Sequence, residues 1–307
     1  MSTYLFQRLV AGLITVWATT VAVTLLIHAV PGDPVQIMYA QSQATTEAQL
    51  DEIRARLGLD QPIWRQYLMF MERLLQGDMG RTIRGDQPVF DLLIARLPNT
   101  LLLAACSLLI ASTLGMTLGF LAAYRRGTWV DTTLMSAALI GVSIPHFWLG
   151  LMLMFLFVMH LAWLPVQAQD FRGVILPAVT LGLSNAAIIA RLTRSSMIDI
   201  FSQDFMRTAW AKGLPKAVVL NRHALRAGLV PIVTMKGLLF TYMMGGAIVV
   251  ENVFAWNGIG RVAIAAITQR DYPTIQGFIL IFAFVVVVVS LIVDLLYALL
   301  DPRIRYR

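Results

Sequence analysis

The stretch LVAGLITVWATTVAVTLLIHAV, residues 9–30, runs for 22 residues without an Asp, Glu, Lys or Arg side chain. A helix that crosses a bilayer needs about 20 mostly apolar residues, so this stretch is long enough to span a membrane. A cleaved signal peptide flanked by Arg8 is the alternative. Its apolar core would be shorter, about 7–15 residues, and small residues would follow it, whereas Pro31 follows here. We therefore expect residues 1–30 to form an N-terminal tip and a retained first transmembrane helix.

The whole chain has the composition of a membrane protein. Of its 307 residues, 58% are apolar and 13% are charged, and its mean hydropathy is +0.72. Soluble domains carry about 25% charged residues, so this chain has too few charges for a soluble surface. Its single cysteine, Cys106, excludes a disulfide framework. The excess of 24 Lys and Arg over 17 Asp and Glu fits basic residues on the cytoplasmic side of a bilayer better than nucleic-acid binding.

Five further apolar runs are candidates for transmembrane helices. They cover residues 100–124, 134–161, 174–189, 229–250 and 277–300. The second of these runs is long for one crossing and contains Pro145. It is therefore either one tilted and kinked helix or two short segments.

The distribution of charge decides the number of crossings. With six crossings and a cytoplasmic N-terminus, the cytoplasmic pieces are the N-terminal tip, residues 125–131, residues 191–226 and the tail 301–307. These pieces hold thirteen Lys or Arg residues and four acids. A seventh crossing would move the basic segment and the basic tail outside, against the positive-inside rule. The sequence thus predicts an all-α integral membrane protein with six transmembrane helices and both termini in the cytoplasm.

Residues 31–98 form a predicted soluble insert on the external side. Two stretches within it, 46–57 and 62–75, have amphipathic helical spacing and are flanked by turn residues. The insert carries nine acids and seven bases, a mixture that suits a solvated domain. The remaining residues, 99–307, would form a five-helix membrane core.

The segment 191–226 is much longer than a link between two helices requires. It is predicted to form two short helices, 197–212 and 215–227, separated at Gly213. Gly213 suits a C-terminal cap and Pro215 the first turn of the next helix. The first helix is amphipathic, so it either docks into a groove of a cytoplasmic partner or rests on anionic lipid. Its spacing alone leaves both interpretations open.

The residues around Gly213 carry a family resemblance. The sequence RTAWAKGLP from Arg207 to Pro215 resembles the EAA loop of bacterial ATP-binding-cassette (ABC) importer permeases of the dipeptide, oligopeptide and nickel subfamily. The loop departs from the general Glu-Ala-Ala pattern at Arg207 and Thr208, and Trp210 is bulkier than the subfamily leads us to expect. Matching motifs extend along essentially the whole chain, including Pro31-Gly32-Asp33-Pro34, Gly77-Asp78-Met79-Gly80, His223-Ala224-Leu225-Arg226, Glu251-Asn252-Val253-Phe254, Arg270-Asp271-Tyr272-Pro273 and Asp301-Pro302-Arg303.

The resemblance implies a fold, partners and a cargo. The fold is that of a type I ABC importer permease, with six transmembrane helices and a soluble external insert, in a bacterial cytoplasmic membrane. The implied partners are a second homologous permease, two ABC ATPase subunits and an extracytoplasmic solute-binding protein. The pathway would carry short peptides, and a nickel or other metal chelate, an opine or a glutathione-like solute is the alternative cargo. An ion-coupled secondary transporter is the alternative from a different mechanistic class.

The resemblance also assigns the segment at Gly213 to contact with the ATPases. The implied coupling residues are Asp204, Arg207, Thr208, Ala209, Lys212 and Gly213. Ala209 and Gly213 are small enough for close approach, and Asp204 or Arg207 could form ion pairs across the contact. Closure of the ATPase dimer would then move the helix around Gly213 as a rigid lever.

The external loop 251–273 is expected to face the binding protein or the solute. The residues assigned to this role are Glu251, Asn257, Gly258, Gly260, Arg270 and Asp271. Asn257 and Gly258 form a tight-turn signal, and Gly260 would allow a further reversal. Asn257 stands where a proline is common in the family. A plain connector is the alternative interpretation of this loop.

Two polar residues within the predicted spans are candidates for the translocation pathway. Lys236 would meet a substrate carboxylate, or its side chain would extend to the cytoplasmic face. Asn185 would face the pathway or hydrogen-bond between helices, and packing is the favoured interpretation. Lys236 and Asp294 are the only Asp, Glu, Lys or Arg residues inside the spans, too few for the proton relay of a secondary transporter.

The chain lacks the sequence features of an ATPase. A Walker A motif requires a Gly-Lys pair, whereas Lys212, Lys216 and Lys236 follow alanine, proline and methionine. We expect ATP and Mg²⁺ to bind partner subunits, and we expect no catalytic residue and no cofactor in this chain. No metal site is predicted either, because the histidines lack ligand spacing; they are His28, His146, His160 and His223.

Overall fold

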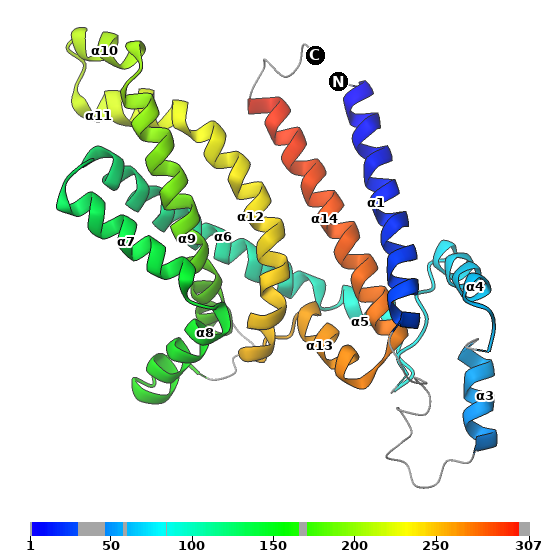
Figure 1. The fold of residues 1–307 in the computed structure, drawn as a ribbon. Coiled ribbons are helices and arrows are strands. Elements are labelled where there is room, and N and C mark those ends of the chain that lie inside the picture. Colours follow the sequence, from blue (N-terminus) through cyan, green and yellow to red (C-terminus); the bar gives the residue numbers. More distant parts are fainter. Residues whose placement is uncertain (1, 30–46, 58–59, 84, 166–170, 301–307) are drawn as a thin grey trace. The chain divides into compact units, whose positions relative to one another are not determined.

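The computed structural model describes residues 2–29, 47–57, 60–83, 85–165 and 171–300. Within these residues the chain is almost entirely made of helices and the turns that join them (Figure 1). The turn motif at 31–34 and the basic tail at 301–307 lie outside the described residues.

The chain divides into two compact units. The first unit consists of Met1–Pro98 and Gly258–Val288, and the second of Asn99–Asn257 and Val289–Arg307. The first contains α1 (Ser2–Ala29), α3 (Glu47–Leu57), α4 (Ile63–Leu75), α5 (Val89–Ile94), α13 (Ile259–Gln269) and the beginning of α14 (Tyr272–Leu300). The second contains most of α6 (Leu97–Tyr124), α7 (Trp129–Ser143), α8 (His146–Met154), α9 (Arg172–Phe201), α10 (Asp204–Ala211), α11 (Lys216–Val218) and α12 (Arg226–Val253), with π-helical turns η1 (Phe155–His160) and η2 (Val219–Leu225).

Both amphipathic stretches of the insert form helices, α3 and α4, as their spacing predicts. Gly77 ends α4 in the left-handed region, with φ of 82°, which costs glycine little. The Asp78 amide then donates to the Arg73 carbonyl at 2.9 Å and closes the last turn. In the same unit, Gly277 leaves room for α5, because an added Cβ would lie 2.5 Å from Val89 Cγ1.

Helix α9 is the centre of the second unit. It packs against α7, α8 and α12, and 72% of its most apolar window is buried. Helix α6 approaches it closely at Gly119, where an added Cβ would lie 2.3 Å from the carbonyl oxygen of Ala190. A backbone atom cannot move aside as a flexible side chain can. Glycine at this position is therefore a condition of the α6–α9 contact.

Five described segments are long and apolar enough to cross a membrane: Phe6–Leu25, Val89–Tyr124, Arg172–Phe201, Pro231–Val253 and Tyr272–Leu295. They match five of the six predicted spans. The sixth span arises when α7 is counted together with α8 and η1. The all-α membrane fold predicted from the sequence is thus confirmed, with one crossing broken.

The break between α7 and α8 is sharper than the kink that was one of the two expectations. The two helices are bent by 99°. Pro145 has no amide hydrogen to donate, and it confines Ile144 to an extended conformation, with φ of −81° and ψ of 122°. The Pro145 carbonyl then accepts from Leu149 at 3.0 Å and starts α8. Proline therefore ends one helix and begins the next.

Candidate functional site

The predicted cytoplasmic helix 197–212 is wrong in its first part. Helix α9 continues without interruption to Phe201, and α10 begins only at Asp204. Gln203 lies between them in an extended conformation, with ψ of 150°. Met197 and Ile200 are buried, so their packing extends α9 beyond the predicted end of the fourth span. The short helix that carries the family motif has eight residues.

One face of α10 packs against other helices of the second unit. Met206 and Ala209 are buried in an apolar cluster with Met197, Val219 and Ala224. Ala209 is thus packed within its own chain, and its close approach to an ATPase stays a prediction. A small residue at this position allows α10 to lie close to α9 and η2.

The other face of α10 is exposed. It carries the predicted coupling residues Asp204, Arg207, Thr208 and Lys212, and two large apolar side chains. These two are Phe205, 39% exposed, and Trp210, 45% exposed. Arg207 Nη1 lies 3.7 Å from Asp204 Oδ1, but both side chains are mostly exposed, so this ion pair contributes little to stability.

Gly213 reverses the chain after α10, as predicted. Its φ is +70°, and its amide donates to the Trp210 carbonyl at 3.0 Å. A Cβ added to Gly213 would meet no atom of this chain within 4 Å. The backbone conformation, and not lack of space within the chain, therefore requires glycine here. Pro215 follows and accepts from the Val218 amide at 2.9 Å, so it starts α11.

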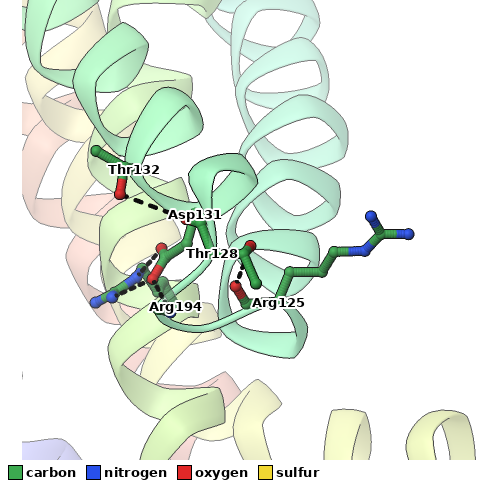
Figure 2. Close-up of polar contacts among 6 residues, drawn as sticks. Arg125, Thr128, Asp131, Thr132 and Arg194 are labelled. Atoms are coloured by element: carbon green, nitrogen blue, oxygen red, sulfur yellow. Dashed lines mark hydrogen bonds and ion pairs between the residues drawn. The ribbon is translucent and has the colours of Figure 1, made fainter.

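An ion pair that the sequence did not predict joins α9, the helix that leads into α10, to α7. Arg194 of α9 binds Asp131 of α7 through two hydrogen bonds, Nε to Oδ1 at 2.6 Å and Nη2 to Oδ2 at 2.7 Å. Figure 2 shows the two side chains facing each other. Asp131 is 4% exposed and also accepts from the Gly127 amide at 3.1 Å. Such two-pronged charged pairs are strong and directional.

A second contact joins the same two regions. The Lys216 ammonium of α11 lies 4.6 Å from the centroid of the Tyr124 ring at the end of α6. This distance fits a cation–π interaction. The coupling segment is thus held to the α6–α7 link on both sides of α10, by Arg194 before it and by Lys216 after it.

The external residue Glu251 is not exposed, contrary to expectation. It lies in the last turn of α12, its exposed fraction is 0%, and its Oε1 accepts from Thr100 Oγ1 at 2.5 Å. A buried carboxylate needs hydrogen-bonding partners within the protein. Glu251 therefore joins α12 to α6 within this chain.

The turn after α12 is made by an unexpected residue. Ala255 has φ of +51°, and Trp256 donates its amide to the Glu251 carbonyl at 2.8 Å. Gly258 has φ of −101° and needs no glycine conformation. Asn257 is exposed, as expected, and its carbonyl accepts from Asn99 Nδ2 at 2.8 Å.

The loop after Gly258 contains a helix that the sequence analysis did not predict. Gly260 lies buried within α13, so the reversal expected there is wrong. Alanine and isoleucine spacing over 259–269 was the available signal. Arg270 ends α13 with φ of +54° and is partly buried.

Asp271 is also structural. It precedes α14, and its Oδ1 accepts from the Thr274 amide at 3.2 Å, the pattern of an N-terminal cap. Its Oδ2 accepts from the Ile83 amide, also at 3.2 Å. The carboxylate is 7% exposed, so the expectation that it faces outward is wrong.

The two pathway candidates differ in exposure. Asn185 is 1% exposed, and its Nδ2 donates to the Leu181 carbonyl at 2.8 Å within α9. Packing, the favoured interpretation, describes it better than contact with a solute. Lys236 is partly buried on α12. Across the described residues, no group of three or more His, Cys, Asp or Glu side chains could hold a metal ion.

Comparison with known proteins agrees with this architecture. Residues 115–306 match the family described as binding-protein-dependent transport system inner membrane component, and residues 1–104 match the N-terminal region of such components. The chain is 41% identical over 308 residues to the glutathione transport system permease protein GsiC of Escherichia coli (strain K12), with all of both chains covered. Its identity to GsiC of Shigella boydii serotype 4 is 40%, again over all of both chains.

Solved structures show the same fold. One chain of the MetNI methionine ABC transporter in an inward-facing conformation matches with a TM-score of 0.55 and 16% identity, over 68% of this chain and 96% of that one. A chain of an amino acid ABC transporter matches with a TM-score of 0.51 and 19% identity, over 69% and 94%. The protein therefore belongs to the family of binding-protein-dependent transport system inner membrane components: it is a multi-pass inner-membrane permease of an ABC importer, a family that works with ATPase and binding-protein partners.

Proposed function

We propose that this permease forms one half of a translocation pathway for short peptides, with glutathione-like tripeptides as the favoured cargo. The cargo class is supported by the 40–41% identity to permeases named for glutathione transport. A second homologous permease supplies the other half. Two ATPase subunits bind ATP and Mg²⁺ on the cytoplasmic side, and a solute-binding protein delivers the cargo from outside. Both termini of the chain lie in the cytoplasm, the orientation that the positive-inside rule favours.

The observation that carries the coupling proposal is the two-faced structure of α10. Met206 and Ala209 anchor the helix to its own chain, while Phe205 and Trp210 are exposed beside charged residues. A large aromatic side chain that is half exposed gains free energy when a partner covers it. We infer that Phe205 and Trp210 enter a groove of the ATPase and that Asp204, Arg207, Thr208 and Lys212 line the rim of the contact.

The lever in this proposal is α10 together with its two attachments. When the ATPases close, α10 moves, and the Arg194–Asp131 pair and the Lys216–Tyr124 contact carry that movement to α9, α7 and α6. Gly213 sets the angle between α10 and α11, which follows it. The pathway opens and closes because the packed helices rock as units.

On the external side, Asn257 and Arg270 remain candidates for contact with the binding protein. In the membrane, Lys236 is the proposed partner of the cargo carboxylate. The Lys236 assignment requires a cargo with an ionised carboxylate, which peptides possess. Lys236→Gln should therefore raise the cargo concentration needed for half-maximal uptake more than it lowers the maximal rate.

The test uses the complete complex, with both permeases, both ATPases and the binding protein, in proteoliposomes. We expect ATP-dependent uptake of radiolabelled glutathione and of an unrelated tripeptide, and no uptake when an ion gradient replaces ATP. Phe205→Ala with Trp210→Ala should abolish ATPase co-purification, while Leu139→Ala, at a 62% exposed position of α7, should not. Uptake on an ion gradient without the ATPases would refute the proposal. Uptake of a nickel chelate with exclusion of both peptides would refute the cargo.

A further inference from the structure

One face of α1 carries a seam of polar side chains. Thr20, Thr24 and His28 follow one another at four-residue spacing, and both threonines are buried. Thr24 Oγ1 donates to the Thr20 carbonyl at 3.0 Å, and His28 Nδ1 lies 2.7 Å from the Thr24 carbonyl oxygen. Nearer its N-terminus, α1 exposes large apolar side chains, including Leu13 and Trp17. In a helix that crosses a bilayer, a polar seam is stable only where protein covers it.

Helix α4 of the insert covers this seam. The hydroxyl oxygens of Tyr67 and Thr20 lie 3.0 Å apart, and His28 Nε2 lies 3.0 Å from Gln66 Oε1. Gln66 Nε2 in turn donates to the Gln61 carbonyl at 2.8 Å, which fixes the amide. Figure 1 shows α4 beside the C-terminal half of α1.

The contact with Thr20 indicates how deeply α4 lies in the bilayer. Thr20 lies nine residues before Ala29, the end of α1, so it is about 13 Å below that end at a rise of about 1.5 Å per residue. Half of the hydrocarbon core of a bilayer measures about 15 Å. A helix whose side chain reaches Thr20 therefore does not stand clear of the membrane in the aqueous phase.

The face of α4 that turns away from the seam is apolar. Trp64 is 65% exposed, Leu68 56% and Leu75 84%. Their spacing of four and seven residues places them on one stripe of the helix. Arg73 lies on the opposite face, and Arg65, Glu72 and Gln76 lie along the flank between the two faces.

We propose that α4 lies in the plane of the membrane, in the outer leaflet, with Trp64, Leu68 and Leu75 among the acyl chains of the surrounding lipid. Gln66 and Tyr67 close the polar seam of α1, and the charged face meets the headgroups. Amphipathic helices of this kind, with a tryptophan at the boundary, bind the membrane interface. For this helix the proposal replaces the predicted solvated insert with contact to lipid. The proposal rests on the orientation proposed above only for the choice of leaflet.

The test places nitroxide spin labels on single cysteines in a Cys106→Ser background, at Leu68, Leu75 and Arg73, in the assembled complex in nanodiscs. Collisions with oxygen, which dissolves in lipid, are compared with collisions with a water-soluble nickel chelate. We expect the oxygen-to-nickel ratio at Leu68 and Leu75 to exceed that at Arg73 about fivefold or more, since the two faces would lie in different phases. Equal ratios at Leu68 and Arg73 would overturn the proposal. A label at Leu68 that becomes immobile when the binding protein is added would also overturn it, in favour of a protein-docking face.

Two further measurements keep the test decisive. A lipophilic photoactivated carbene reagent, applied to the complex without any substitution, should modify Trp64, Leu68 and Leu75 and leave Arg73 unmodified; the reverse pattern would refute the lipid contact. An impermeant maleimide should label Arg73→Cys in intact cells. Labelling only in inside-out vesicles would reverse the orientation and the leaflet, but it would leave the depth measured by the spin labels unchanged.

Discussion

The cytoplasmic segment around α10 and the external loop around α13 carry equally recognisable family motifs, but the structure uses them differently. At α10 the motif residues Arg207 and Lys212, together with Asp204, are exposed. At the external loop Glu251 and Asp271 are buried and bind Thr100 and Ile83. The first motif presents a surface to a partner, whereas much of the second holds helix ends together. The charge of a residue in a family motif therefore does not predict whether its side chain is exposed or buried.

The largest effect is expected at Glu251. Glu251→Ala leaves the buried Thr100 hydroxyl without its carboxylate partner and opens a cavity, so we expect the free energy of unfolding to fall by about 2–4 kcal/mol. Thermal denaturation of the purified permease, followed by size-exclusion chromatography, measures the loss. Glu251→Gln is the matched control, because its side-chain carbonyl still accepts from Thr100. If Glu251→Ala keeps full stability and loses only stimulation by the binding protein, the contrast between the two regions fails.

Gly213 is the next position to test. Its φ of +70° strains any residue with a Cβ, by about 1–2 kcal/mol for most and less for asparagine. Gly213→Val should therefore lower ATP-dependent uptake strongly while the chain still inserts, and Gly213→Asn should retain most uptake. Both variants are compared at equal membrane abundance. An equal loss in both would mean that space at the ATPase contact, and not backbone angle, requires glycine.

The Arg194–Asp131 pair tests whether α10 is a lever. A hydrogen bond to a charged group contributes about 1.5–3 kcal/mol, so Asp131→Asn should loosen the base of the segment without unfolding it. We expect the rate of uptake to fall more than the rate of ATP hydrolysis. The number of ATP molecules consumed per solute molecule transported should therefore rise. Arg125→Gln is the control, because Arg125 lies on the same link and its side chain points away from the pair (Figure 2). A proportional fall in uptake and hydrolysis would assign Asp131 to stability alone.

The sequence predicts the spans well because hydropathy is local. Each of five apolar runs became a helix, and most helix ends moved by a few residues. The exception is α9, which continues from the predicted end at residue 189 to Phe201 because residues such as Met197 are buried. The right-angle break at Pro145 was predicted only as a choice between kink and split. Proline fixes where a helix stops, but the packing of α8 against α9 and α12 fixes the direction in which it resumes.

The candidate sites were predicted less completely because their partners are distant in sequence. Thr100 and Glu251 are 151 residues apart, Ile83 and Asp271 are 188 apart, and Asp131 and Arg194 are 63 apart. No spacing rule connects such residues before the helices are packed. The face of α10 was recoverable in principle, because Met206 and Ala209 are three residues apart and lie on one side of a helix.

The smallest effect is expected at the exposed pair Asp204 and Arg207. Their side chains are 95% and 79% exposed, so removing either should leave thermal stability unchanged. If α10 is a docking surface, however, Arg207→Ala should weaken binding of the ATPase to the permease about two- to fivefold at low salt, because charges at the rim of an interface act across it. Near 1 M salt the difference should vanish, since the Debye length falls to about 3 Å. Arg261→Ala, an exposed arginine of the external helix α13, serves as the matched control and should not change the affinity. A salt-independent loss at Arg207 would mean that the residue shapes α10 itself, and the two regions would then differ less than their exposure indicates.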